Sequence, residues 1–196
     1  MTTPKRRIIA WCSVSIDGYS SGPKGPAHDT WLYQHSFNPS MAEHYEGIWR
    51  GCSSILLGRN NYLGFHGVWP GITRDPVTDP RTRSLGQWLD SVDKAVVSTT
   101  LEETPWANTR IFPDPRSAVD TLRGETGGDV LVTNSATLIQ SLLREDLVDD
   151  LRLAVVPVML GGGIRLLPED AAGTWSLVST TVLPHGAISV HYRREP

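Results

Sequence analysis

The stretch that decides the fold is Asp129–Leu167, which reads DVLVTNSATLIQSLLREDLVDDLRLAVVPVMLGGGIRLL. It opens with Asp129–Thr133, a short run rich in valine and leucine, as expected of a buried strand. Apolar residues then recur with the spacing of one helical face, at Leu138, Ile139, Leu142 and Leu143. A second apolar run follows at Leu151–Val156. The stretch therefore predicts strand, helix and strand in succession, the unit from which parallel sheets are built.

Asn134 and Ser135 stand where the first of these strands gives way to the helix. Both residue types commonly cap helix N-termini. The free N–H groups and the positive dipole end at such a place also attract anions. This junction therefore either caps a helix and has no further role, or receives a phosphate group of a ligand.

The composition describes an ordinary soluble globular protein, and we expect one domain over residues 1–196. The formal net charge of −3 and a pI near 6.0 give no reason to expect nucleic-acid binding. The basic cluster Lys5-Arg6-Arg7 is predicted to be a solvated strand end. No apolar run has the length of a membrane span, and Met1–Arg7 lacks the apolar core of an export signal, so we expect a cytoplasmic protein.

Cysteine and histidine usage argues against disulfides and metals. Cys12 and Cys52 fall in or beside apolar segments, which favours buried free thiols over a disulfide framework. The six histidines show no ligand spacing with cysteine or with one another. The sequence therefore predicts no metal site.

The rest of the chain alternates between predicted strands and helices. Further strands are predicted at Arg7–Ser15, Ser53–Leu57, Lys94–Ser98 and Thr109–Phe112. One helix should run from Pro39 to about Gly51, with Ser40 and Glu43 at the spacing of a capping box, and another should follow Asp114-Pro115. Gly64–Arg83 holds three prolines and few apolar residues, which is typical of a long surface loop. The segments Trp175–Leu183 and Ala187–Arg193 predict a terminal hairpin, so we expect a mixed, mostly parallel sheet covered by helices.

Polar residues follow four of the predicted strands, where ligands bind in open α/β sheets. The four groups are Asp17-Gly18, Gly58-Arg59-Asn60-Asn61, Ser98-Thr99 and Thr133-Asn134-Ser135. Arg59 offers a planar cationic fork that suits a phosphate monoester. Taken singly, an arginine there is equally consistent with a surface ion pair, and Ser98-Thr99 with a turn. The order of all four groups predicts a dinucleotide site.

At these residues the chain resembles the dihydrofolate reductase-like superfamily, in particular the branch related to the C-terminal reductase domain of the riboflavin-biosynthesis deaminase-reductase. The matching motifs are Ser15–Gly18, Leu57–Tyr62, Lys94–Leu101 and Asp146–Leu151, the last running into Pro157–Gly163. The resemblance implies a three-layer α/β/α fold with a central mixed, mostly parallel sheet and a C-terminal antiparallel hairpin. It also implies bound NADPH and hydride transfer to a small heterocyclic or carbonyl substrate.

The same resemblance assigns roles within the site. Arg59, Asn60 and Asn61 would hold the adenosine 2′-phosphate side, with Ser98 and Thr99 beside them. Thr133, Asn134 and Ser135 would meet the pyrophosphate, and Gly18 and Gly58 complete the predicted cofactor-binding set. Relatives usually have glycine where this chain has Asn134, and asparagine is the best non-glycine residue for a positive φ.

Catalytic residues are harder to match. The first helix of true dihydrofolate reductases presents an acidic residue to the pterin, and Glu43 and Glu46 are unconvincing equivalents, so we do not expect folate reduction. Asp17, or a water that it holds, is the predicted proton donor, although an Asp-Gly turn explains Asp17 equally well. Trp31 and Tyr45, with Trp69, could form an aromatic wall for a flat substrate or simply pack in the core.

Two further expectations concern alternatives and assembly. A non-catalytic domain of the same fold that binds a nucleotide or small ligand is the competing interpretation. A Rossmann dehydrogenase is disfavoured, because no Gly-x-Gly-x-x-Gly motif follows the first strand, and Gly161–Gly163 is interpreted as a tight strand exit. We expect a homodimer, because the apolar run Val155–Leu160 and the terminal hairpin offer more apolar strand surface than one domain covers.

Overall fold

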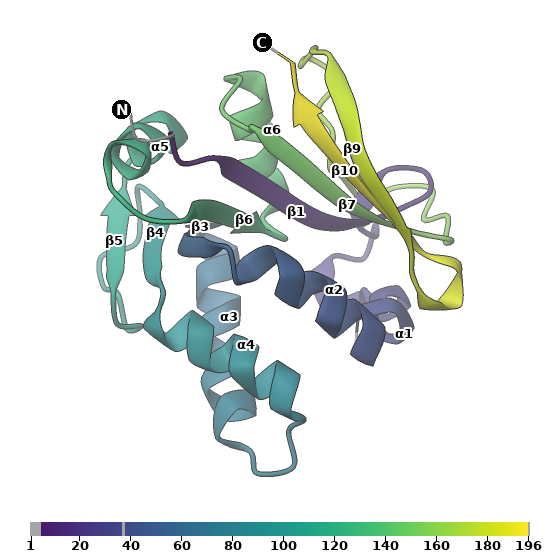
Figure 1. The fold of residues 1–196 in the computed structure, drawn as a ribbon, viewed down its shortest axis with the longest axis horizontal. Coiled ribbons are helices and arrows are strands. Elements are labelled where there is room, and N and C mark those ends of the chain that lie inside the picture. The colour runs from purple at the N-terminus through teal and green to yellow at the C-terminus, as the bar shows by residue number, and fades with distance from the viewer. Residues whose placement is uncertain (1–4, 37, 196) are drawn as a thin grey trace.

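The protein is a three-layer α/β/α structure built on one eight-stranded sheet (Figure 1). The computed structural model describes residues 5–36 and 38–195. In chain order the strands of this sheet are β1 (Ile8–Ser15), β3 (Cys52–Gly58), β4 (Asp93–Val97), β5 (Thr109–Phe112), β6 (Asp129–Thr133), β7 (Asp150–Val156), β9 (Trp175–Val182) and β10 (Ile188–Arg194). Their order across the sheet is β5-β4-β3-β6-β1-β7-β10-β9.

The strands from β5 to β7 pair in parallel, whereas β10 runs antiparallel to β7 and β9 antiparallel to β10. This confirms the predicted mixed, mostly parallel sheet with a C-terminal hairpin. The register sets Trp11 of β1 opposite Thr133 of β6, and Gly58 of β3 opposite Val97 of β4. Because parallel strands end at the same edge of a sheet, the segments that follow β1, β3, β4 and β6 converge there.

Helices cover both faces of the sheet, as Figure 1 shows. One face packs against α5 (Pro115–Gly124) and α6 (Ala136–Arg144), and the other against α2 (Pro39–Trp49), α3 (Arg59–Arg74) and α4 (Pro80–Ser91). In β1 the residues alternate between these layers, so that Ala10 and Cys12 face α6 while Ile9 and Trp11 face α2. Across the described ranges no helix combines the length and apolar character needed to cross a bilayer.

The predicted free thiols are confirmed. Cys12 and Cys52 are both buried and free, and burial raises the pKa of each thiol to about 12. Each thiol donates a weak hydrogen bond to a backbone carbonyl, Cys12 to Ser13 and Cys52 to Ile48. A thiol with so high a pKa is a poor nucleophile, so these residues contribute packing rather than reactivity.

Short elements border the carboxyl edge of the sheet. They are β2 (Tyr19–Ser21), β8 (Ile164–Arg165), η1 (Pro26–His28), η2 (Thr30–Leu32), α1 (Tyr33–Ser36) and η3 (Pro184–Gly186). Strands β2 and β8 form a separate two-stranded sheet. Gly163 has a φ of 119°, and a Cβ there would lie 2.1 Å from the backbone oxygen of Ser21, so only glycine allows this close approach. The glycine triplet is thus a tight turn between β7 and β8, as predicted.

The prediction of a surface loop over Gly64–Arg83 is wrong, because most of this segment belongs to α3 and α4. Helix α3 continues past Pro70 to Arg74. Its buried side is aromatic and packs with α4 in a core cluster that includes Tyr62, Phe65, Trp69, Trp88 and Leu89. The packing of these large side chains outweighs the missing amide of Pro70.

The predicted capping box at Ser40 and Glu43 is also wrong. Asn38 precedes α2 instead, and its side chain accepts a hydrogen bond from the Met41 amide at 2.9 Å. Glu43 forms an ion pair with Arg81 of α4. Pro39 does occupy the first turn, as predicted.

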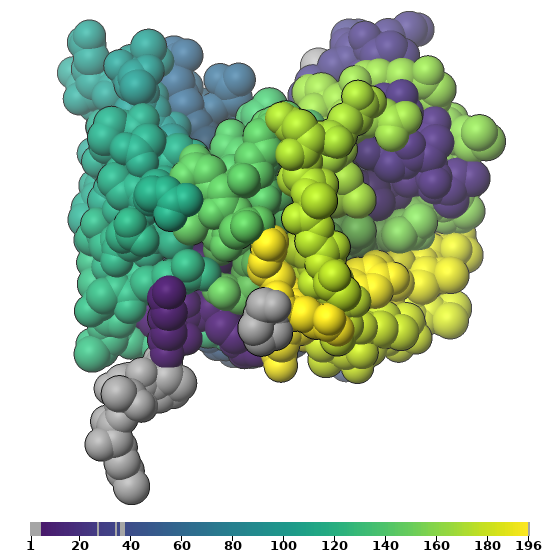
Figure 2. Space-filling view, turned by 90° about the horizontal axis from the view of Figure 1, so that it is seen from above, coloured from purple at the N-terminus to yellow at the C-terminus, as the bar shows by residue number. Residues whose placement is uncertain are grey.

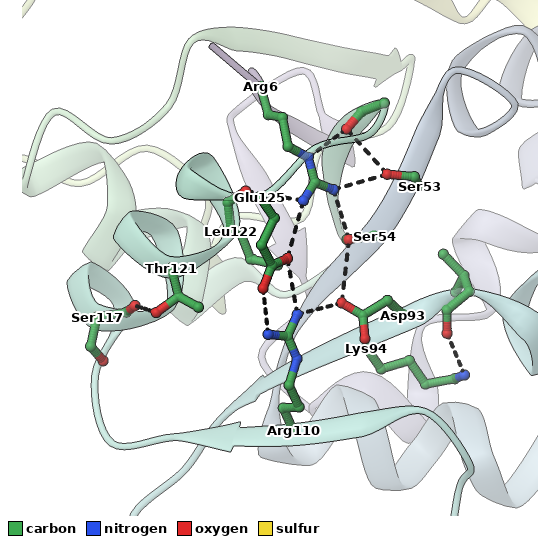
Figure 3. A network of polar contacts seen from close by, with 12 residues as sticks. Arg6, Ser53, Ser54, Asp93, Lys94, Arg110, Ser117, Thr121, Leu122 and Glu125 are labelled. Atoms are coloured by element: carbon green, nitrogen blue, oxygen red, sulfur yellow. Dashed lines mark hydrogen bonds and ion pairs between the residues drawn. The ribbon is translucent and has the colours of Figure 1, made fainter. Parts of the chain in front are cut away.

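Arg6 is not a solvated strand end, as the composition of Lys5–Arg7 suggests, but a buried residue with 5% exposure. Figure 3 shows its guanidinium at the centre of a polar network at the amino ends of the strands. It donates hydrogen bonds to the carbonyl oxygens of Leu122 and Gly128, the hydroxyls of Ser53 and Ser54, and the Glu125 carboxylate. These acceptors belong to α5, β3 and the segment before β6, so one side chain joins three parts of the chain.

The network continues through Arg110 of β5, whose guanidinium contacts both Glu125 and Asp93 (Figure 3). The hydrogen bond from Arg110 is the main reason that the pKa of Glu125 lies below its usual value. Lys94 is buried nearby in β4, and its ammonium donates to the carbonyl oxygens of Val92 and Ala107 at 2.9 and 3.0 Å. Desolvation lowers the Lys94 pKa to about 8.

Three histidines are at least partly withdrawn from water on the α2 side of the molecule. They are His35 of α1, His44 of α2 and His191 of β10. Burial is the main cause that lowers the pKa of each ring, with further lowering by His185 at His35 and by Arg152 at the other two. His191 also contacts the buried Asp150 carboxylate at 2.5 Å, which opposes the shift without reversing it.

We expect thermal stability to fall as the pH drops below about 6.5, the ordinary histidine value. The folded-state pKa values lie below the unfolded value, so the unfolded chain takes up protons first. Stability present above the unfolded pKa is therefore lost as the pH falls towards the folded pKa. Calorimetry of wild type, His44→Gln and the exposed-site control His28→Gln across this window measures the effect. His44→Gln should flatten the decline and His28→Gln should not, and equal slopes in all three would contradict the assignment.

Candidate functional site

The β6–α6 junction is tied to the end of β3 by a small hydrogen-bond network. The side-chain amide of Asn61 donates to the Thr133 carbonyl oxygen at 2.6 Å and to Ser135 Oγ at 2.9 Å. The Gly58 amide donates to the same Ser135 hydroxyl at 3.3 Å. The structure therefore brings together four of the residues predicted to bind cofactor, and their polar groups are partly used to shape the junction itself.

Asn134 has the left-handed backbone that glycine usually supplies at such a junction. Its φ is 49°, its amide donates to the Trp11 carbonyl oxygen at 2.9 Å, and the residue is exposed. Ser135 precedes α6, but its hydroxyl makes no capping bond to the helix. The first-turn amides of α6 therefore lack a cap from this side chain and remain able to bind an anion.

Arg59 and Asn60 open helix α3 directly after Gly58, and both are exposed. Within the part of the chain that the structure describes, the Arg59 guanidinium has no ion-pair partner. This distinguishes Arg59 from arginines such as Arg110 and Arg116, which face carboxylates. Arg59 follows Gly58, whose amide contacts Ser135 at the β6–α6 junction, so its unpaired guanidinium provides a cationic group for a phosphate at this edge of the sheet.

Ser98 and Thr99 follow β4, whose last residue pairs with Gly58. The Ser98 hydroxyl accepts hydrogen bonds from the amides of Thr100 and Leu101, at 3.1 and 2.9 Å. Ser98 therefore shapes a turn, the alternative interpretation of this dipeptide, whereas Thr99 is exposed at the same edge.

Asp17 lies at the end of β1 but is poorly suited to donate a proton. Its carboxylate accepts hydrogen bonds from Ser15 Oγ at 2.6 Å, the Gly161 amide at 2.8 Å and the Leu160 amide at 3.2 Å. The Ser15 bond, followed by the Gly161 and Leu160 amides, lowers the Asp17 pKa to about 2. The group is ionised at neutral pH, which argues against the predicted acid role. Asp17 instead holds the loop after β7, and Gly18, at a φ of 85°, turns the chain towards β2.

Trp31 and Tyr45 are both braced internally. The indole N–H of Trp31 donates to Asp29 Oδ1 at 2.9 Å, and this carboxylate also accepts the Gly22 amide at 2.8 Å. The Tyr45 hydroxyl donates to Thr133 Oγ1 at 2.9 Å, and its ring centroid lies 5.5 Å from that of Trp11. Tyr45, predicted to contact substrate, therefore contacts Thr133, a residue predicted to bind the cofactor.

Sequence reasoning missed Trp11 and His44 as neighbours of the site. The Trp11 ring packs against Tyr45, and the Trp11 carbonyl oxygen accepts a hydrogen bond from the Asn134 amide. The centroid of the His44 ring lies 5.7 Å from that of Trp11. His44 Nε2 also lies 2.7 Å from the hydroxyl of Ser189. The alternation of side chains along β1 could have indicated the position of Trp11, because it places Trp11 on the same face of the sheet as Ile9.

A cavity of about 500 Å³ lies elsewhere, between α6, the segment 167–174 and the hairpin β9–β10. Its lining is mainly leucine, alanine and aromatic residues, and it contains none of the predicted site residues. The carboxyl edge gathers the polar groups of four strand ends, which is where open α/β sheets bind ligands, so this edge is the candidate site.

Known proteins resemble this chain over most of its length. A putative riboflavin biosynthesis protein from Shewanella sp. PV-4 has a TM-score of 0.72 at 21% identity, covering 97% of this chain and 99% of that one. The deaminase and 5-amino-6-(5-phosphoribosylamino)uracil reductase from Thermotoga maritima has a TM-score of 0.66 at 13% identity, covering 97% and 57%. The uncharacterized protein YyaP of Bacillus subtilis (strain 168) is 27% identical over 191 residues, or 96% of this chain and 95% of that one.

Because these solved structures are only 21% and 13% identical to this chain, they show its fold alone, which is dihydrofolate reductase-like. A family model gives the assignment itself, because it matches nearly the whole chain rather than one motif. With residues 6–189 matching the model described as RibD C-terminal domain, the chain belongs to the RibD C-terminal domain family.

Proposed function

We propose that this protein is an NADPH-dependent reductase that transfers a hydride to a small heterocyclic or carbonyl substrate. Membership in the RibD C-terminal domain family supports a reductase in general, and the structural neighbour from Thermotoga maritima is named as a 5-amino-6-(5-phosphoribosylamino)uracil reductase. The observation that carries the cofactor proposal is the meeting of Arg59, Asn134 and the start of α6 at one edge of the sheet.

The residues at this edge fit the parts of the cofactor. The α6 amides and the left-handed backbone at Asn134 suit a pyrophosphate, and Arg59 suits the 2′-phosphate. When bound, NADPH would supply the hydride, while the chain orients the ring and excludes water. In this proposal Asp17 positions the loop at Leu160 and Gly161 over the site and is not the acid.

Consumption of NADPH tests the proposed reaction. We expect the purified protein to oxidise NADPH in the presence of at least one member of a panel of ribosylaminopyrimidines, pterins and quinones. Dihydrofolate should be a poor substrate, because α2 offers no buried carboxylate to grip a pterin, and Glu43 and Glu46 pair with Arg81. NADPH binding without oxidation by any panel member would favour the non-catalytic ligand-binding domain, and absence of NADPH binding would contradict the proposed reductase.

We also propose a homodimer that forms along β9, the edge strand of the sheet. Its sequence, WSLVSTTV, has no charge and no proline, the residues that normally protect an exposed edge. Leu177 is 58% exposed and Val182 82% exposed. Figure 2 shows β9 (yellow-green) at the surface beside α6 (green), with no other element over it. Surface of this kind in a soluble protein is typically covered by a partner.

Charge on this strand should therefore abolish the dimer. We expect Leu177→Glu combined with Val182→Glu to sediment as a monomer at concentrations where the wild type is dimeric, because paired edges would bring like charges together. Ile111→Glu is the matched control, since it places a charge on β5 at the opposite edge. A monomeric wild type, or a dimeric double variant, would count against this interface.

A further inference from the structure

Tyr45 reaches the β6–α6 junction through two separate contacts. Its hydroxyl donates a hydrogen bond to Thr133 Oγ1 at 2.9 Å. Its ring packs against Trp11, whose carbonyl oxygen accepts the Asn134 amide at 2.9 Å. Burial is the main cause that raises the Tyr45 pKa, so the hydroxyl keeps its proton and stays a donor throughout the ordinary pH range.

Both contacts help to fix the conformation of the β6–α6 junction. Thr133 is 1% exposed, so water could hardly replace the hydrogen bond that its hydroxyl accepts from Tyr45. Asn134 has a positive φ, a conformation that non-glycine residues hold only when their surroundings fix it. A second helix also holds this junction, because Asn61 of α3 donates to the Thr133 carbonyl and to Ser135. The junction is thus held by side chains from both α2 and α3.

We propose that Tyr45 is a positioning residue that couples helix α2 to the cofactor seat at Thr133–Ser135. This inference rests on the proposed function, with the pyrophosphate at the junction, and on the predicted aromatic wall, in which Tyr45 would set the substrate against α2. A ligand that presses α2 onto the sheet tightens both contacts of Tyr45 and stabilises the binding conformation of the junction. By reciprocity, an occupied junction favours the position of α2 that receives substrate.

The coupling predicts a particular pattern of cofactor affinity. Tyr45→Phe removes the bond to Thr133 and keeps the ring on Trp11, so we expect NADPH affinity to fall roughly 3- to 10-fold, the worth of about one hydrogen bond. NADH affinity should fall by the same factor, because the junction faces the pyrophosphate that both cofactors share. Thr133→Val should produce a similar loss, and the double variant should lose no more than either single variant.

Titration of each variant with NADPH and NADH, alongside thermal unfolding, tests this pattern. Tyr192→Phe is the matched control, since this tyrosine lies on β10 against the α6 layer, away from the junction. It should leave both affinities unchanged. A Tyr45→Phe variant that loses thermal stability but keeps full NADPH affinity would show a merely structural role and overturn the proposal, while leaving the proposed function intact.

A measurement that needs no cofactor distinguishes failure of the proposed coupling from failure of the proposed function. We expect hydrogen exchange at the Gly58 amide, which donates to Ser135, to be faster in Tyr45→Phe than in wild type and in Tyr192→Phe. If the wild type binds no NADPH, the proposed function fails, and this exchange still decides the coupling. Unchanged protection at Gly58 would overturn it.

Discussion

Arg6→Met is expected to lower the free energy of unfolding by about 3–5 kcal/mol, the usual cost of removing one partner of a buried ionic network. Methionine preserves much of the volume but leaves the hydroxyl of Ser54, the carbonyls of Leu122 and Gly128, and the Glu125 carboxylate without their donor. Glu125 also keeps Arg110, which limits the loss at that residue. Chemical denaturation of the purified variant measures the change.

Arg116→Met is the appropriate control for this experiment. Arg116 lies in α5 and pairs with Glu145, and the two side chains are 53% and 35% exposed, so neither group is buried. Exposed ion pairs contribute about 0–1 kcal/mol, so this variant should unfold at nearly the wild-type denaturant concentration. Similar losses in the two variants would contradict the stabilising role that the structure gives to the buried Arg6.

Arg59→Ala is expected to weaken NADPH binding by about one to two decades and to leave NADH binding almost unchanged. Hydrogen bonds to charged groups contribute roughly 1.5–3 kcal/mol, and only NADPH carries the 2′-phosphate that Arg59 would meet. Arg59 is exposed and opens α3, so its loss should cost little stability. Fluorescence titration with both cofactors measures the two affinities, and Arg116→Ala provides an arginine control outside the site. Equal losses for NADPH and NADH would contradict the assignment.

The stretch Asp129–Leu167 predicts its elements well, because one physical signal dominates there. The apolar positions of α6 repeat with helical spacing and are all buried, and the flanking apolar runs form β6 and β7. Those strands sit on either side of β1, at the centre of the sheet. In this region the local hydrophobic pattern and burial at the centre of the sheet favour the same elements, so the pattern alone predicts them.

Prediction fails where distant partners decide the outcome. Pro70 and its polar neighbours suggested a loop, yet packing of Phe65 and Trp69 against α4 keeps the segment helical. Arg6 looked solvated because its acceptors lie 47 to 122 residues away in the chain. Local propensity carries no information about partners at that separation.

The site shows the same division. Sequence order placed the polar groups at the carboxyl ends of β1, β3, β4 and β6, and the sheet brings these ends to one edge. Individual roles were less accessible, because they depend on which donor meets which acceptor. Asp17 is an example, since its carboxylate accepts hydrogen bonds from the Leu160 and Gly161 amides, which the chain brings back after β7.

The other expectations about the site depend on NADPH binding at the edge formed by Arg59, Asn134 and α6. Isothermal titration of the wild-type protein with NADPH and with NADH in the same buffer tests it most directly. We expect saturable binding of NADPH at about one molecule per chain, with affinity roughly ten-fold or more above that of NADH. No binding of NADPH, or equal affinity for the two cofactors, would contradict it.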